Sequence, residues 1–233
     1  FMLVKFTASR NQLISKVATY AMAAGTTIGI DIYDHFDPAT GVVSGQRTHQ
    51  AGLPCELPGY YTFTLDEPVA VTAGNDFYIR IYYQTPSYDY PIPIEDAIAG
   101  YSAPHIETNK AWIGYDSNGE SNYWFAIGSG TGYLWDPCVK AYAEPLLSWA
   151  GTQSTDWNSA ANWSPGEVPS PKQNVDIPAT ATPPLISNAL TSPATCKALI
   201  IREGASLTLA AGAALTVYAG ITNYAGTPGL VTE

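Results

Sequence analysis

The sequence contains few charged residues. Asp, Glu, Lys and Arg make up 13% of its 233 residues, about half the share found in an ordinary soluble protein. Coiled coils and long exposed helices need such residues on their solvated faces, so this scarcity argues against both. The 10 Lys and Arg residues and 20 Asp and Glu residues give a formal net charge of -10. A protein with this charge repels a phosphate backbone, and we expect no nucleic-acid partner.

Long apolar runs and cysteines are also scarce. Because no run approaches the roughly 18 apolar residues of a membrane helix, we expect no membrane insertion. The chain starts at Phe1 without a basic and then apolar leader, so we interpret it as a fragment or a processed form. Its three cysteines, Cys55, Cys138 and Cys196, are too far apart for a zinc or Cys-x-x-Cys motif. Cys55 and Cys138 could form a disulfide after export, but buried free thiols are the favoured interpretation.

Motifs of the common enzyme classes are missing. The sequence has no Gly-x-Ser-x-Gly elbow, His-Glu-x-x-His motif, Walker loop or dinucleotide fingerprint. Its three histidines, His35, His49 and His105, are isolated beside turn residues. Glu95 and Asp96 are adjacent, and neighbours on a strand point to opposite faces. A glycoside hydrolase needs two carboxyls from different strands in one cleft. We therefore expect no enzyme, and keep a hydrolase using Glu95 as a lesser alternative.

Aromatic residues are abundant, and they alternate with polar ones. The chain has 16 Tyr, 6 Trp and 6 Phe, far more buriable surface than a disordered chain carries. In residues 77–83 (FYIRIYY), alternate side chains are apolar on one face, as in a half-buried strand. Sustained helical periodicity is nearly absent. Similar patterns predict strands at residues 2–6, 12–20, 27–33, 59–65, 77–83, 111–115, 123–127 and 137–142, with turns at 37–41 and 116–119. We predict an all-β protein built on an antiparallel β-sandwich of the jelly-roll or lectin-like kind.

A change in composition near residues 143–145 predicts a domain boundary. Fifteen of the twenty acidic residues lie at or before Glu144, and we assign residues 1–145 to the sandwich and 146–233 to a smaller β-rich module. The module opens with Trp149, Trp157 and Trp163, which we predict to be core residues, with a sugar-stacking role as the alternative. It ends in a short repeat, residues 204–209 (GASLTL) and 212–217 (GAALTV). So short a repeat predicts stacked strands, either a β-solenoid or a small meander. We expect further polypeptide beyond Glu233, because such stacks need several rungs.

The stretch from residue 101 to residue 135 predicts a ligand site. It holds eight aromatic residues, interleaved with Asp, Asn and Gly. Aromatic faces stack on sugar rings while Asp and Asn bond to hydroxyls, so the mixture suits glycan capture. The candidate ligand-binding residues are Trp112, Tyr115, Asp116, Tyr123 and Trp135. The alternative is a core role, which alternation requires for about half of the rings, Trp112 and Trp124 first.

Three carboxylates form a weaker candidate site. Asp31, Asp34 and Asp37 could offer oxygen ligands to Ca²⁺, although their spacing lacks the Gly and distal Glu of an EF-hand loop. Solvated loop carboxylates are the alternative interpretation. Apart from this calcium option, we expect no cofactor.

Several segments of the first part carry a family resemblance. They are residues 59–66 (GYYTFTLD), 73–74 (AG), 77–79 (FYI), 90–95 (YPIPIE), 112–113 (WI) with Asp116, and 138–142 (CVKAY). In order and spacing they resemble the lectin-like domain that accompanies papain-family cysteine peptidases and other secreted bacterial proteins. The second part is similar to β-rich modules that begin solenoid-like stalks of secreted or surface-anchored bacterial proteins.

The resemblance implies a function and a location. It implies a non-catalytic module of a larger secreted or cell-surface bacterial protein, binding carbohydrate or another cell-surface polymer beside neighbouring domains of the same polypeptide. The alternative is a structural spacer that presents a neighbouring peptidase or adhesin domain. Recognition requires exposed rings in the candidate site, whereas a spacer is compatible with buried ones.

Overall fold

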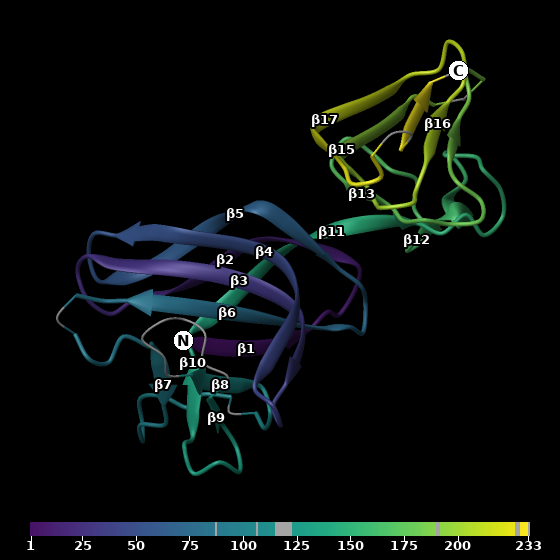
Figure 1. Ribbon diagram of the computed structural model, residues 1–233. Helices are drawn as coiled ribbons and strands as arrows, with labels where there is room; N and C mark the ends of the chain where they lie inside the picture. The colour runs from purple at the N-terminus through teal and green to yellow at the C-terminus, as the bar shows by residue number, and fades with distance from the viewer. Residues whose placement is uncertain (87, 106, 115–122, 190–191, 227–228, 233) are drawn as a thin grey trace. The chain divides into compact units, whose positions relative to one another are not determined.

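The computed structural model describes residues 1–86, 88–105, 107–114, 123–189, 192–226 and 229–232. The chain folds as two compact units, one of residues 1–10 and 14–143, the other of residues 11–13 and 144–233. The structure confirms an all-β fold: the described residues form strands and a single short 3-10 helix (Figure 1). No helix of this described part is long and apolar enough to cross a membrane.

The first unit is built around a six-stranded antiparallel sheet. Its strands lie in the order β4-β3-β6-β1-β8-β9. Their bounds are β1 (Met2–Thr7), β3 (Thr26–Asp37), β4 (Val42–Cys55), β6 (Asp76–Gln84), β8 (Ala111–Gly114) and β9 (Trp124–Ile127). A second sheet contains β5 (Gly59–Val71), β2 (Gln12–Ala21) and the start of β11 (Val139–Trp149). A small antiparallel pair, β7 (Ile94–Asp96) and β10 (Trp135–Pro137), completes the unit.

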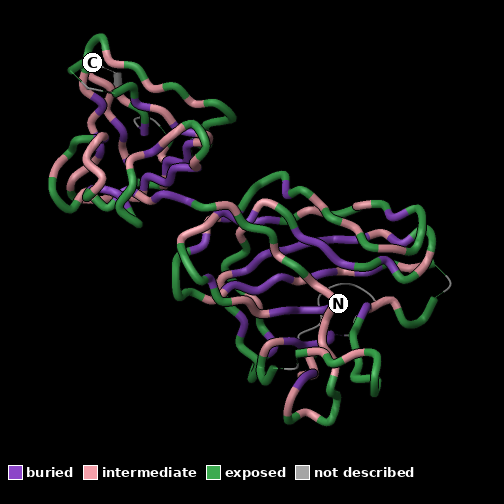
Figure 2. Tube along the Cα trace, turned by 180° about the vertical axis from the view of Figure 1, so that it is seen from behind, coloured by how far each residue is buried: buried purple, intermediate pink, exposed green. Residues whose placement is uncertain are grey.

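The core of the first unit lies between the two sheets, as in a sandwich. Ile14 and Val17 of β2 pack in one cluster with Ile30 of β3 and with Ile79 and Ile81 of β6, each at most 1% exposed. Figure 2 shows buried positions along the central strands and exposed ones in the loops. Burying each such side chain stabilises the fold by about 1.5–3 kcal/mol relative to leaving it in water.

The six-stranded sheet also packs rings on its outer face. Met2 and Val4 of β1 belong to the sandwich core, whereas Leu3 between them points to the other side. The outer aromatic cluster consists of Leu3, Tyr33, Phe36, Tyr78 and Trp112, with Trp124 packed against it. Both faces of this sheet therefore carry buried apolar side chains.

The second unit stacks its strands in parallel. The end of β11, β13 (Asn174–Ile177), β15 (Ala194–Ile201) and β17 (Leu215–Asn223) form one parallel row, and β14 (Leu185–Ile186), β16 (Leu207–Leu209) and β18 (Leu230–Thr232) form another. A 3-10 helix, η1 (Ala160–Asn162), leads into β12 (Trp163–Ser164), which pairs antiparallel with β11. From β13 onward, paired positions in both rows are 21 to 24 residues apart.

The short sequence repeat does not set this stacking. Its first copy lies on β16 and its second on β17, which belong to different rows. The offset of eight residues is therefore the spacing between two consecutive strands of one coil. The repeat that separates stacked strands of the same row is about three times longer. Leu207 of the first copy is fully buried, as the apolar positions of a stacked strand must be.

The three tryptophans of the second unit are core residues, which confirms the sequence prediction. Trp149, Trp157 and Trp163 are 1%, 0% and 3% exposed. The Trp163 ring meets Trp149 and Trp157 edge-on, with centroid distances of 4.9 and 4.8 Å. Beside them, Asn162 is fully buried, and its Oδ1 accepts hydrogen bonds from the backbone N–H groups of Gln153 and Ser154.

Candidate functional site

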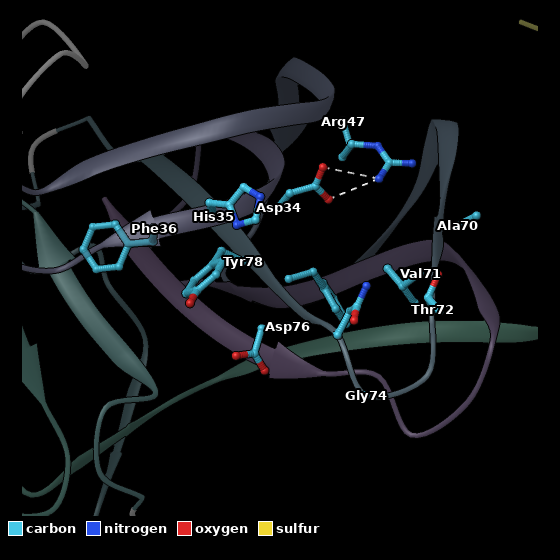
Figure 3. Close-up of a pocket in the computed structure, with 12 residues that line it drawn as sticks. Asp34, His35, Phe36, Arg47, Ala70, Val71, Thr72, Gly74, Asp76 and Tyr78 are labelled. Carbon is cyan, nitrogen blue, oxygen red and sulfur yellow. Dashed lines mark hydrogen bonds and ion pairs between the residues drawn. The ribbon is translucent and has the colours of Figure 1, made fainter. Parts of the chain in front are cut away.

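One candidate site is a pocket of about 530 Å³ in the first unit, which we call the hairpin pocket. The β3–β4 hairpin runs past the last β3–β6 pair, Tyr33 with Tyr78, and its overhang faces the turn between β5 and β6 (Figure 3). The lining residues are Asp34, His35, Phe36, Arg47, Ala70, Val71, Thr72, Gly74, Asn75, Asp76, Phe77 and Tyr78. Its volume falls within the usual range for small-molecule sites.

Local backbone chemistry positions the pocket walls. At the hairpin tip, the backbone N–H of Gly41 donates to the Asp37 carbonyl, and Asp37 Oδ1 accepts from the N–H of Ala39, which confirms the turn predicted at residues 37–41. Trp124 fastens this tip, because its indole N–H donates to the Gly41 carbonyl at 3.0 Å. On β4, Arg47 is the extra residue of a bulge, and bulges redirect side chains.

Both carboxylates of the hairpin pocket are paired with cations. Asp34 Oδ1 lies 3.1 Å from Arg47 Nη1 (Figure 3). Asp76 Oδ2 lies 2.6 Å from Lys5 Nζ, and its Oδ1 accepts a 2.6 Å hydrogen bond from the Thr7 hydroxyl. The hydrogen bond from Lys5, followed by that from Thr7, lowers the pKa of Asp76 below its ordinary value. The pocket therefore presents paired charges, and the Asp76 carboxylate stays ionised at neutral pH.

Several polar side chains of the hairpin pocket are left open to a ligand. Within the described part of the chain, the side chains of His35, Thr72 and Asn75 have no hydrogen-bond or ion-pair partner. Beside them, the rings of Phe36 and Tyr78 meet edge-on at 6.0 Å, and both are nearly buried. An imidazole, a hydroxyl and an amide together offer donors and acceptors to a molecule rich in hydroxyl groups.

The structure corrects the role predicted for Trp112. Its side chain is 5% exposed and meets Phe36 edge-on at 4.8 Å inside the outer aromatic cluster. The prediction that Trp112 offers an exposed ring to a ligand is therefore wrong, and its core alternative is the one observed. Trp112 supports Phe36 and Tyr78 from behind, and so contributes to the hairpin pocket only indirectly.

The other candidate ligand residues lie elsewhere. Trp135 packs against Ala111 and Ile113, which occupy the opposite face of β8 from Trp112. Tyr123 is 70% exposed. Tyr115 and Asp116 lie outside the described residues. The predicted set is thus not one cluster among the residues that the structure describes, because strand alternation sends its rings to two faces.

Trp135 lines a second hollow of about 330 Å³. Asp136, His105, Glu107 and Lys110 line it too, and Tyr133 lies 5.0 Å from Trp135 between ring centroids. Burial, and then the nearby charge of Glu95, raise the pKa of Asp136 above its ordinary value.

A hydrolase would need two carboxyls in one cleft. Glu95 on β7 pairs directly with Asp136 on β10, so separate strands do bring two acids side by side. Of these two acids only Asp136 lines the second hollow, and Glu95 is exposed with Oε1 accepting a 2.6 Å hydrogen bond from the Ser102 hydroxyl. The other carboxyl of the hollow is Glu107, which lies 3.9 Å from Lys110 Nζ. This placement leaves Glu95 outside the hollow, which disfavours a hydrolase that uses Glu95.

The three candidate calcium ligands do not converge. Asp31 is 5% exposed, and its carboxylate is bound by Arg80, His49 and Gln46 at 2.6–2.9 Å. Asp34 pairs with Arg47, and Asp37 caps its own turn. No group of three or more metal-ligating side chains occurs in the described residues. The calcium prediction for Asp31, Asp34 and Asp37 is therefore wrong, because each carboxylate already has its own donors.

The cysteines occur as free thiols. Cys55 and Cys196 are buried and Cys138 is half-buried. Burial raises the pKa of all three thiols, and that of Cys196 reaches about 12. The thiols are therefore protonated at neutral pH, and none has the character of a nucleophile.

Comparison with known families assigns the first unit. A family model described as a lectin-like domain matches residues 5–143, more than half of the chain. The chain belongs to the lectin-like domain family. A second model, described as a domain of unknown function (DUF8693), matches residues 148–228. No curated protein and no solved structure matches the chain.

The lectin-like unit contains functional candidates that sequence reasoning missed. The sequence marks His35 only as an isolated loop histidine, and no motif singles out Thr72 or Asn75. Their grouping depends on the β3–β4 overhang and on the β5–β6 turn, which are far apart in the sequence. The sequence signal that could have found them is the turn-forming composition of residues 72–75 (TAGN). In the structure, Gly74 of this turn has a φ of 82°.

Proposed function

We propose that the lectin-like unit is a non-catalytic recognition module that binds carbohydrate in the hairpin pocket. The observation that carries this proposal is the set of open side chains, His35, Thr72 and Asn75, around a pocket whose charges are paired. Sugar hydroxyls both donate and accept hydrogen bonds, so they satisfy imidazole, hydroxyl and amide groups together. Because Arg47 is already paired with Asp34, the pocket favours a neutral sugar over an anionic one.

The second unit fits the role of a spacer. Its strands stack in parallel rows, and its three tryptophans are buried, so none of these three rings is accessible to a ligand. We interpret it as a β-solenoid-like module that presents the lectin-like unit and neighbouring domains, a cysteine peptidase or an adhesin among the candidates. The protein would then act outside a bacterial cell, holding a larger polypeptide on a glycan or another cell-surface polymer.

A glycan array with site variants tests the proposal. The array is probed with calcium and with a chelator, using the unmodified chain, His35→Ala, Asn75→Ala and Trp135→Ala. We expect binding without calcium, weakened in the first two variants and unchanged in Trp135→Ala. Each lost hydrogen bond of about 1 kcal/mol weakens binding roughly fivefold.

Other outcomes separate the alternatives. Binding lost only in Trp135→Ala would move the site to the second hollow. Absence of binding to every glycan, together with no rise in melting temperature on adding any of them, would leave the spacer role for the whole chain. Release of sugar from any polysaccharide would restore the hydrolase alternative.

A further inference from the structure

Three side chains of the second unit meet across three neighbouring strands. Glu144 lies on β11, Asn174 on β13 and Lys197 on β15. Glu144 Oε2 accepts a 2.9 Å hydrogen bond from Asn174 Nδ2, and the same oxygen pairs with Lys197 Nζ. An amine and a carboxamide are thus gathered on one carboxylate oxygen.

The backbone holds this triad in register. Asn174 pairs with Leu146 of β11 on one side and with Ala198 of β15 on the other. The N–H of Lys197 donates to the Gln173 carbonyl at 2.7 Å. Asn174 is 2% exposed, so its amide is largely shielded from water. The residues that would react are therefore positioned by main-chain pairing before any reaction begins.

We propose that Lys197 and Asn174 form an intramolecular isopeptide cross-link, assisted by Glu144. Nζ of Lys197, after giving a proton to the Glu144 carboxylate, attacks Cγ of Asn174. The C–N bond to Nδ2 breaks as the departing nitrogen takes up the carboxyl proton and the second proton of the attacking Nζ, and it leaves as ammonium. The products are an amide joining Lys197 to residue 174, an ionised Glu144 and one ammonium ion, which carries the charge that Lys197 has lost, so atoms and charges balance without an oxidant or a cofactor.

The grouping differs from the other lysine ion pairs of the described residues. Lys5 shares the Asp76 carboxylate with a hydroxyl, that of Thr7, and Lys110 lies 3.9 Å from Glu107. Neither carboxylate accepts a hydrogen bond from a side-chain amide within the described part of the chain. A lysine, a carboxylate able to carry a proton and a buried amide are brought together at Glu144.

Solvent exposure sets the rate of the reaction. The side chains of Lys197 and Glu144 are 39% and 40% exposed, so solvent base reaches the pair. Only a neutral amine attacks an amide carbon. Cross-linking is therefore expected to be faster in alkaline solution than at neutral pH.

Intact-mass spectrometry of the folded chain tests the cross-link. After incubation at about pH 9, we expect a mass lower than the sequence mass by one ammonia molecule. Lys197→Arg keeps the positive charge beside Glu144 but lacks a nucleophilic amine, and Glu144→Gln keeps a polar partner but cannot take the proton. Both variants should retain the full sequence mass.

Trypsin supplies a second measurement that does not depend on how well the variants fold. Cleavage after Lys172, Lys197 and Arg202 of an unlinked chain yields peptides 173–197 and 198–202. A cross-linked Lys197 resists trypsin, so one looped peptide of residues 173–202 is expected. A full sequence mass with cleavage at Lys197 would overturn the proposal, as would a loss of ammonia that persists in Lys197→Arg. Neither result bears on carbohydrate binding, since the cross-link lies in the second unit.

Discussion

The two units use aromatic and polar side chains in opposite ways. In the lectin-like unit, rings occupy both faces of the six-stranded sheet, and polar groups such as His35 and Asn75 are left without partners in the described structure. In the second unit, Trp149, Trp157 and Trp163 are all buried, and the buried Asn162 bonds to groups of its own unit. The lectin-like unit therefore leaves polar side chains available to a ligand, whereas the second unit uses its polar and aromatic side chains to stabilise its fold.

The strongest test of this comparison removes a ring from each unit. Trp163→Ala deletes a side chain that contacts two other buried indoles, and should cost about 3–5 kcal/mol in the unfolding free energy of the second unit. Chemical denaturation followed by near-ultraviolet circular dichroism measures the loss. Trp135→Ala is the matched change at a half-buried ring and should cost less. Equal costs would mean that the two units do not differ in this respect.

The next largest effect concerns Asn162. Asn162→Ala leaves the N–H groups of Gln153 and Ser154 without their acceptor, at a cost of about 2 kcal/mol. The control is Asn188→Ala, whose exposed amide donates to the Ala211 carbonyl and should cost under about 0.5 kcal/mol. A shift in denaturation midpoint that is no larger for Asn162→Ala than for the control would contradict an internal role for this amide.

A smaller effect links stability to recognition at Gly45. This residue has a φ of 68°, and an added Cβ would lie 3.0 Å from the Asp34 Cβ. Gly45→Ala should cost about 1 kcal/mol and weaken glycan binding by disturbing the Asp34–Arg47 pair. Gly52→Ala is the matched control, because Gly52 has a φ of 71° on the same strand and nothing within 4 Å. Calorimetric titration should show weaker binding in Gly45→Ala alone.

The smallest expected effect is a pair of opposite pH dependences within the lectin-like unit. Lys5 lowers the pKa of Asp76, so this carboxylate stabilises the fold above its ordinary pKa near 3.8, and the contribution is lost as pH falls through the lowered value. Burial raises the pKa of Asp136, so its ionisation costs stability as pH rises from about its ordinary value through the raised one.

Two isosteric variants separate these contributions. At pH 7, Asp76→Asn should be less stable than the unmodified chain and Asp136→Asn more stable, each by less than about 1 kcal/mol because both groups are partly solvated. Both differences should shrink as the acids become protonated, near about pH 3. Melting temperatures measured from acid to neutral pH check the signs, and equal signs would contradict the assignment of partners.

Strand alternation made much of this fold predictable from sequence. The runs that became β1, β2, β6 and β9 show apolar alternation, as in β6, or short apolar and aromatic stretches, as in β9, and each begins and ends within about one residue of its predicted bounds. The strand β4 was missed because it lies at a sheet edge and carries polar residues, such as His49 and Gln50, on both faces. An edge strand need not bury a face, so the usual pattern is absent.

The candidate site was harder to predict, for a related reason. Alternation cannot tell the core face from an outer face that also packs rings, so Trp112 could be assigned either way. The open side chains His35 and Asn75 carry no motif, and they meet only because the overlooked β4 extends the hairpin beyond β6. Sites made by unequal strand lengths depend on register, which a single sequence specifies weakly.

The irregular strand β4 also protects the molecule from its own copies. β4 is an edge of the six-stranded sheet, and an edge strand can template pairing with another chain. Its register against β3 shifts at two places, and each shift interrupts the regular row of donors and acceptors that such pairing requires. The bulge that directs Arg47 toward Asp34 therefore lowers the tendency to aggregate, and a variant that straightens β4 should form fibrils more readily.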